Sequence, residues 1–304
     1  MESTSSVSTC EASKFAVEDV INTMLSNVVS CILDFLPLQD AVRTSILSRN
    51  WRYKWTMINQ VVFDNDFFEY IMRTKGDVDG RIITRVLVYH EGSITKFVLD
   101  IPRHKRFDDD DIYLWAKLLS TKSVKEIVIV NKNITPIVLP TLLFSCVDLK
   151  HLKLCRCCFH VNAAAAAASL GCFPKLLSLE FDLVNSWELV IGSDIFQLVG
   201  FLPKLHRLTL DLHNCSRFMV DAAAAGNLKV LQVLDLDYDN CAMVSFFFDL
   251  IQGSPNLEIL RIRAINKDRV FPSPVTLDQV KAGITGYLQQ LRNVDFVYLK
   301  DSHV

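Results

Sequence analysis

A short apolar pattern recurs at nearly constant spacing through most of this 304-residue chain. Six copies fit the template apolar-x-x-apolar-x-apolar: VKEIVI from Val124, LKHLKL from Leu149, LLSLEF from Leu176, LHRLTL from Leu205, LQVLDL from Leu231 and LEILRI from Leu257. Weaker copies begin at Ile94 and Leu291. The six clear copies start 25, 27, 29, 26 and 26 residues apart. Such regular spacing indicates stacked structural units, each burying its apolar residues against its neighbours.

Each copy predicts a short β-strand, because its last two apolar positions alternate with other residues as on one face of an extended chain. The stretches between copies must return the chain to the next strand, and WAKLLS, preceded by the acidic residues 108–111, fits a helix there. Parallel strands joined in this way are typical of leucine-rich repeats. We therefore predict an α/β fold with an N-terminal helical module and, over residues 81–304, a curved leucine-rich-repeat solenoid with a parallel concave sheet.

A second pattern follows each strand, four residues beyond its last apolar position. The residues at this offset are Asn133, Cys158, Asn185, Asn214, Asn240 and Asn266. In a leucine-rich repeat, an inward asparagine amide bonds backbone groups of neighbouring coils that would otherwise lack partners in the core. We expect these residues to form such a ladder. The alternative is that asparagine is simply common in loops.

The strand geometry also predicts which side chains line the concave face. Side chains alternate along a strand, so the third, fifth and seventh template positions should face the same side. The seventh positions are Asp182, Asp211, Asp237 and Arg263, and the fifth positions are Glu180, Thr209, Asp235 and Arg261. We expect these rows to bind a client segment that carries lysine or arginine. Two alternatives are a solvated polar face without function and a calcium site.

The N-terminal part of the chain reads differently from the repeats. Residues 1–14 are rich in Ser and Thr and predict a flexible tail, and residues 63–80 read as a linker. Between them, residues 15–62 predict a helical module. Pro37 separates its first two short helices, and the third helix carries Trp51 and Trp55 on one face. This aromatic pair indicates packing rather than nucleic-acid binding. So small a module buries too little surface alone, which favours a protein partner.

The segment FLPLQDAVRTSILSRNWRYKW resembles the F-box of plant F-box/FBD/leucine-rich-repeat proteins. The resemblance covers about residues 17–63 and implies a three-helix module that docks on the Skp-type adaptor of a cullin-RING ubiquitin ligase. The expected adaptor-binding patch comprises Met24, Leu25, Val29, Ile32, Leu36, Pro37 and Leu38. Residues 24–27 read Met-Leu-Ser-Asn, where the family usually has Leu-Pro and acidic residues. We expect the C-terminal FBD domain of the family to be lacking.

Charge and cysteine usage narrow the class of protein. The chain has 32 basic and 34 acidic residues, a net charge of −2, so no global field attracts nucleic acid or an anionic membrane. Nine cysteines and the absence of a signal-like start predict reduced thiols in the cytoplasm or nucleus. No apolar run reaches the length of about 18 residues that a membrane helix needs.

Catalytic and metal-binding patterns are absent from the sequence. CRCCFH at 155–160 suggests zinc, but Cys158 occupies the position of the asparagine pattern, and no second Cys-x-x-Cys or His pair completes four ligands. There is no Gly-rich phosphate loop and no nucleophile elbow. We expect no cofactor, no metal and no enzymatic activity.

The predicted function is the substrate-recognition subunit of an SCF-type ligase, with a cullin reached through the adaptor and a client protein held by the repeats. One alternative is a leucine-rich-repeat scaffold whose degenerate F-box has no ligase partner. Another is a small-molecule receptor, which a shallow repeat array disfavours.

Overall fold

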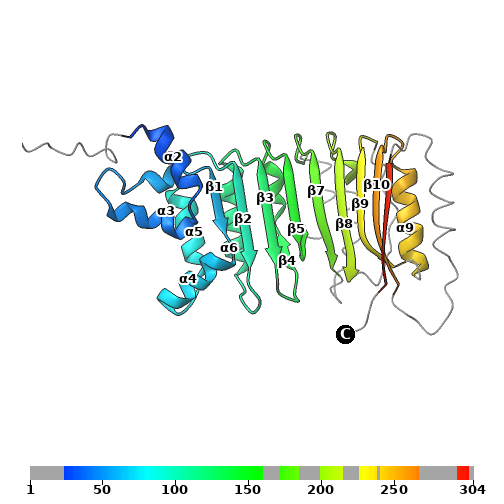
Figure 1. Cartoon of the computed structure of the whole chain (residues 1–304), viewed down its shortest axis with the longest axis horizontal. Coiled ribbons are helices and arrows are strands. Elements are labelled where there is room, and N and C mark those ends of the chain that lie inside the picture. The colour runs from blue at the N-terminus through cyan, green and yellow to red at the C-terminus, as the bar shows by residue number, and fades with distance from the viewer. Residues whose placement is uncertain are drawn as a thin grey trace, which may run out of the picture.

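The computed structural model describes residues 24–159, 172–184, 199–214, 226–237, 240–266 and 293–300. Within these ranges, nine parallel strands form one sheet along the length of the molecule (Figure 1). They lie side by side in chain order: β1 (Gln60–Phe63), β2 (Lys96–Ile101), β3 (Glu126–Asn131), β5 (His151–Cys155), β7 (Ser178–Val184), β8 (Arg207–Asn214), β9 (Val230–Asp237), β10 (Ile259–Asn266) and β11 (Asn293–Lys300). The predicted α/β class and parallel sheet are confirmed.

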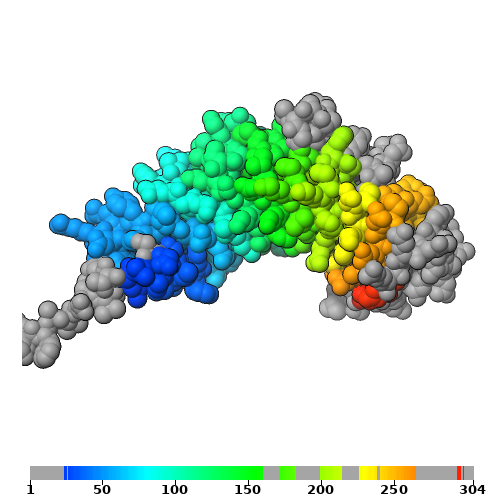
Figure 2. Space-filling model, turned by 90° about the horizontal axis from the view of Figure 1, so that it is seen from above, coloured from blue at the N-terminus to red at the C-terminus, as the bar shows by residue number. Residues whose placement is uncertain are grey.

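The segments between the strands contain the helices. They are α4 (Asn65–Lys75), α5 (Gly80–Tyr89), α6 (Asp109–Ser120) and α9 (Cys241–Gln252), with a 3-10 turn η3 (Thr141–Ser145) and a small second parallel sheet of β4 (Ile137–Leu139) and β6 (Cys157–Phe159). The helix predicted after the acidic run is α6, whose first turn carries three aspartates. Figure 2 shows that the molecule is bowed into an arc. No helix within the described ranges is long and apolar enough to cross a membrane.

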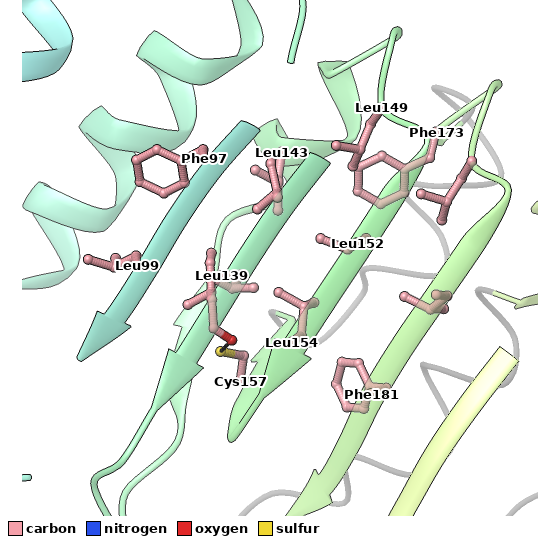
Figure 3. Packing of buried hydrophobic residues seen from close by; sticks show 14 of the residues in the cluster. Phe97, Leu99, Leu139, Leu143, Leu149, Leu152, Leu154, Cys157, Phe173 and Phe181 are labelled. Carbon is pink, nitrogen blue, oxygen red and sulfur yellow. Dashed lines mark hydrogen bonds between the residues drawn. The ribbon is translucent and has the colours of Figure 1, made fainter. Parts of the chain in front are cut away.

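The apolar core lies between the sheet and these connecting segments. In β5 and β7 the fourth and sixth template positions, such as Leu152 and Phe181, are at most 2% exposed. Figure 3 shows Leu152 beside Leu143 and Phe173, which the connecting segments contribute, and Phe181 on the side of Leu154. Alternate residues in β2, β3 and β5 are only half-buried and point away from this core. We call this second surface the open face of the sheet; it comprises the side chains at the third, fifth and seventh template positions.

Strand β9 does not start its repeat where the template placed it. Leu208, the fourth position of its repeat, pairs with Leu231, which the repeat spacing predicts as a first position. The repeat therefore begins at Leu228, which is fully buried, and the template slips by three residues. The register with β10 then shifts near Asp235, where the backbone has φ 60°. The bulge adds one residue to β9, so the register with β10 is shifted by one residue beyond it.

The N-terminal module contains α2 (Ser26–Asp34) and α3 (Leu38–Arg43), divided at Pro37 as predicted. The predicted third α-helix is wrong. The chain instead forms 3-10 turns, η1 (Thr44–Ile46) and η2 (Lys54–Met57). Aromatic and polar residues around Asn50 are poor helix formers, and backbone bonds there span three residues, as from Trp51 N to Ser48 O (3.2 Å). Trp51 is buried and Trp55 packs against the core, so the aromatic pair does serve packing.

The predicted linker at residues 63–80 is an ordered part of the fold. Phe63 ends β1, and α4 follows, capped by Asp64, whose Oδ1 accepts a bond from Phe67 N (2.9 Å). Helix α4 ends at Gly76, which adopts φ 78° as a left-handed cap. Two phenylalanines of α4 are buried, and this burial holds the segment against the sheet. The N-terminal module thus joins the sheet without a flexible tether. The predicted tail at residues 1–14 lies outside the described residues.

Candidate protein-binding surfaces

Helix α2 carries its apolar side chains on two adjacent faces. One face, with Val29 and Leu33, is buried in the core. The other face is a row that we call the α2 stripe, and its exposed residues are Leu25 (70% exposed), Val28 (42%), Ile32 (40%), Phe35 (89%) and Leu36 (38%). These positions recur every three or four residues, so they line one side of the helix and the turn after it. The N-terminal module leaves this apolar row without a covering element among the described residues.

The structure corrects the predicted adaptor patch in two ways. Val29 and Leu38 are 2% and 3% exposed, because they face the core rather than solvent, and Met24 is half-buried against it. Leu25, Ile32, Leu36 and Pro37 are exposed as expected for a patch. Sequence reasoning missed Phe35 and the exposed Ile46 and Leu47 after α3. The helical period could have separated the two faces, since Val28, Ile32 and Phe35 are out of phase with Val29 and Leu33.

A hydrogen-bonded junction fixes the α2 stripe relative to the sheet. At the end of α2, the carboxylate of Asp34 accepts bonds from the backbone N (2.6 Å) and the side-chain Nδ2 (2.8 Å) of Asn59. The carbonyl of Asn59 in turn accepts from Thr95 N at 2.8 Å, one residue before β2. Buried His90 lies 2.7 Å by Nε2 from Ile58 O, and burial lowers the pKa of its imidazole. These contacts orient the stripe against the first two strands.

The open face changes character along its length. At the fifth position the register aligns Val62, Val98 and Val128 across β1, β2 and β3. Further along, Lys153 pairs with Glu180 at 2.5 Å and Arg261 with Asp295 at 3.4 Å. Thr209 and, by the corrected register, Gln232 lie between these two pairs. The row is therefore apolar near the N-terminal module and charged beyond β3.

A hollow of ≈ 310 Å³ lies on this face over β3, β5 and β7. Its polar lining consists of Glu126, His151, Lys153, Ser178 and Glu180. It stands where the apolar part of the face meets the charged part.

The acidic row is only partly where the sequence placed it. Asp182 and Asp211 are register neighbours on β7 and β8, as predicted. Asp235 reaches the open face through the β9 bulge, where its carboxylate accepts a bond from Arg263 Nε (2.6 Å) and lies 3.0 Å from His213 Nδ1. Asp237 was predicted beside them, but it is 3% exposed, and its backbone N lies 3.0 Å from the sulfur of Met243 in α9.

Asp182 is the carboxyl of this row whose pKa is shifted most from its ordinary value. Its Oδ1 is shielded from solvent and has no hydrogen-bond partner among the described residues. Burial, and then the neighbouring charge of Asp211, raise the pKa of Asp182 to about 6. Within the described ranges neither Asp182 nor Asp211 forms an ion pair, although Asp211 Oδ1 accepts a bond from His213 N (3.1 Å).

The predicted asparagine ladder has mixed outcomes. Asn133 does bond the neighbouring coil, donating from Nδ2 to the carbonyls of Lys105 (2.6 Å) and Pro102 (3.3 Å). Cys158 is buried. Asn240 is not a ladder residue, because the slipped register places it at the start of α9, where its Oδ1 accepts from Ala242 N and Met243 N. Asn185 and the side chains of Asn214 and Asn266 lie outside the described residues.

The most buried amide is one that the pattern missed. Asn131 is 2% exposed and donates from Nδ2 to Thr135 O (2.8 Å) and Arg156 O (3.1 Å), while its Oδ1 accepts from Asn133 N (3.0 Å). It joins the loops after β3 and β5. No repeated asparagine marks this offset in the other copies, so the repeat pattern could not reveal it.

The cysteines at positions 155, 157 and 158 have the properties of packing residues, because their thiols are at least partly buried and protonated. Burial raises the pKa of Cys155 and Cys158 to about 11 and that of Cys157 well above its ordinary value, so their thiols stay protonated. Metal ligation requires thiolates. Within the described residues, no group of three histidine, cysteine or acidic side chains is arranged to hold a metal ion.

Comparison with known proteins matches both parts of the chain. Residues 23–61 match the F-box domain, and residues 112–191 match the family described as "FBD-associated F-box protein At5g56370, LRR repeats". Among curated proteins of Arabidopsis thaliana, the chain is 35% identical over 220 residues to "F-box/FBD/LRR-repeat protein At1g13570", covering 70% of this chain and 48% of that protein. It is 25% identical over 256 residues to "FBD-associated F-box protein At3g52670", covering 84% and 56%. The chain thus spans about half the length of these relatives.

Proposed function

We propose that this chain, which carries an F-box domain followed by leucine-rich repeats of the plant F-box/LRR kind, is the substrate-recognition subunit of an SCF-type ubiquitin ligase. In this proposal the F-box docks on a Skp-type adaptor, which connects it to a cullin. The parallel strands and their return segments form a leucine-rich-repeat solenoid whose open face holds a client protein. The complex works in the cytoplasm or nucleus, where its cysteines stay reduced.

The α2 stripe is the observation that carries this proposal. Five large apolar side chains on a nine-residue helix and the residues that flank it are exposed, although the same helix buries another face. Monomeric proteins rarely expose contiguous apolar surface of this kind unless a partner covers it. A protein interface of standard size buries about 1,600 Å² in total, and the stripe with Ile46 and Leu47 can supply its apolar centre.

The chain contributes proximity rather than chemistry in this role. Neither matched family is an enzyme family. A receptor that binds both adaptor and client raises the effective concentration of client lysines near the ubiquitin-carrying enzyme. The junction through Asp34 and Asn59 supports this role, because a fixed angle between the F-box and the open face keeps that distance constant.

Substituting the stripe tests the proposal directly. Ile32→Asp with Leu36→Asp should abolish co-purification of a Skp-type adaptor, because each carboxylate would have to be buried unpaired in the interface. Ile134→Asp is the matched control, since Ile134 is 90% exposed on a loop after β3 and far in sequence from α2. Its adaptor recovery should equal that of the parent. Circular dichroism should show all three proteins folded, and full adaptor recovery by the double variant would refute the assignment.

A scaffold without a ligase partner is the second candidate function. It is favoured by residues 24–27, Met-Leu-Ser-Asn, where the family resemblance leads one to expect Leu-Pro and acidic residues. In that case the parent chain itself should fail to recover the adaptor.

A further inference from the structure

The carboxylates of the open face differ in whether they have a cationic partner. Five of those described are ion-paired: Asp100 with Lys132, Glu126 with Lys96, Glu180 with Lys153, Asp235 with Arg263, and Asp295 with Arg261. Asp182 and Asp211 form no such pair with any described residue. They are also neighbours in register, on strands that lie about 4.8 Å apart. Two like charges this close oppose each other unless a counter-charge intervenes.

The surroundings of this pair fit an incoming cation on a flexible stem. Asp182 is half-buried, and its shielded Oδ1 accepts no hydrogen bond from any described residue. Asp211 is held in place by the bond from His213 N. Beside the pair, the half-buried Cys155 and Val130 are themselves paired in register on β5 and β3. They offer an apolar path along which the methylene stem of a basic side chain can lie.

The valine row supplies a second contact on the same face. Val62, Val98 and Val128 are half-buried, and they project from the face that carries the carboxylates. The hollow over β3, β5 and β7 includes Val128 in its lining and lies at the third to fifth template positions, on the side of the valine row away from the carboxylate pair.

We infer that the open face binds an extended protein segment that places an arginine or lysine on Asp182 and Asp211 and an apolar side chain on Val98 and Val128. This inference rests on the proposed function, because it names the chemistry of the client. Arginine suits the site better, since its planar guanidinium can bond two carboxylates at once. The five ion-paired carboxylates of the open face already bind cations of the chain itself. The client's basic residue therefore binds at Asp182 and Asp211.

The geometry also sets the spacing of the two side chains. The midpoint of Val98 and Val128 lies three strand steps from that of Asp182 and Asp211, or about 14 Å across the sheet. The fifth and seventh positions differ by about 7 Å along the strands. The combined distance of about 16 Å corresponds to four or five residues of an extended segment.

A selection from a phage library of random 12-residue peptides tests this inference. The full-length chain is the bait, beside Asp182→Asn with Asp211→Asn, which keeps shape and removes both charges. Asp109→Asn with Asp110→Asn is the matched control, because it removes two exposed charges at the start of α6, away from the open face. We expect the parent and the control to enrich peptides with arginine or lysine four or five residues from an apolar residue. Such peptides should bind the double variant about ten- to a hundredfold more weakly.

Three outcomes would overturn the inference: no binder to the parent, binders without basic residues, or equal binding to the double variant. A calcium site is a fourth, shown if calcium alone raises the melting temperature of the parent and not of the double variant. Adaptor co-purification is measured separately from the peptide selection. Failure of the inference is therefore distinguishable from failure of the proposed function, which the α2 variants decide.

Discussion

Replacing Asp182 with asparagine should stabilise the free protein at neutral pH. The pKa of this carboxyl rises from an ordinary 3.8 to about 6 on folding, because burial and the charge of Asp211 disfavour its ionised form. The penalty is therefore absent below about pH 3.8, grows as the pH rises towards 6, and is complete above it. Asparagine carries no charge at any of these pH values, and its amide can donate to Asp211.

The size of the effect follows from the shift in pKa. Each unit corresponds to about 1.4 kcal/mol, so a shift of about two units sets a ceiling of about 3 kcal/mol on the free energy of unfolding. Asp182 is only partly buried, and solvent screening reduces this value. We expect a gain of about 1–2 kcal/mol at pH 7.5, and less than half of that at pH 4.5, where the parent carboxyl is mostly protonated in the fold.

Equilibrium urea unfolding at the two pH values measures this difference, since a shifted midpoint with an unchanged slope reports stability alone. Asp109→Asn serves as control and should give no gain, because that exposed carboxylate lies favourably in the first turn of α6. A loss of stability in Asp182→Asn at pH 7.5, or a gain of equal size at both pH values, would refute the argument that an ionised carboxylate, partly buried beside Asp211, costs stability here.

Two further changes test the loops and the register. Asn131→Ala should lower the free energy of unfolding by about 2–3 kcal/mol, because the carbonyls of Thr135 and Arg156 and the backbone N of Asn133 would lose a buried partner; a change below about 0.5 kcal/mol in urea unfolding would contradict this. Asn240→Ala should cost about 1 kcal/mol and Asn240→Asp should recover most of it, if the residue caps α9; equal losses in the two variants would speak against the cap.

The parts of the fold that the sequence predicted well are those governed by periodic burial. In five of the six clear copies the template marked the buried positions of a strand, as with Leu149, Leu152 and Leu154. The helix α6 followed from its acidic first turn. Both signals are local, because apolar spacing and a favoured helix start depend on residues within a few positions of each other.

The N-terminal errors have a different origin. The sequence of residues 63–80 predicts a linker, because α4 is short and charged. The order of this segment depends on core contacts: Phe67 packs against Phe63, and Phe68 packs against Phe107, which is distant in sequence. Likewise, the side of α2 that stays exposed depends on where the sheet lies. Val28 and Val29 are chemically alike, and tertiary packing alone decides that one is exposed and the other buried.

The repeat that contains β9 was predicted in the wrong register, because its sequence fits the template in two ways. Two overlapping segments fit the template, LKVLQV from Leu228 and LQVLDL from Leu231. They have three residues in common, beginning with Leu231. Spacing favoured the second choice, because it kept the intervals uniform, whereas pairing with Leu208 requires the first. One extra residue of β9 is then accommodated at Asp235, whose positive φ turns its carboxylate toward Arg263 and His213. The bulge thereby places Asp235 on the open face with partners of its own, and it leaves Asp182 and Asp211 as the carboxylates on which a client's basic residue can act.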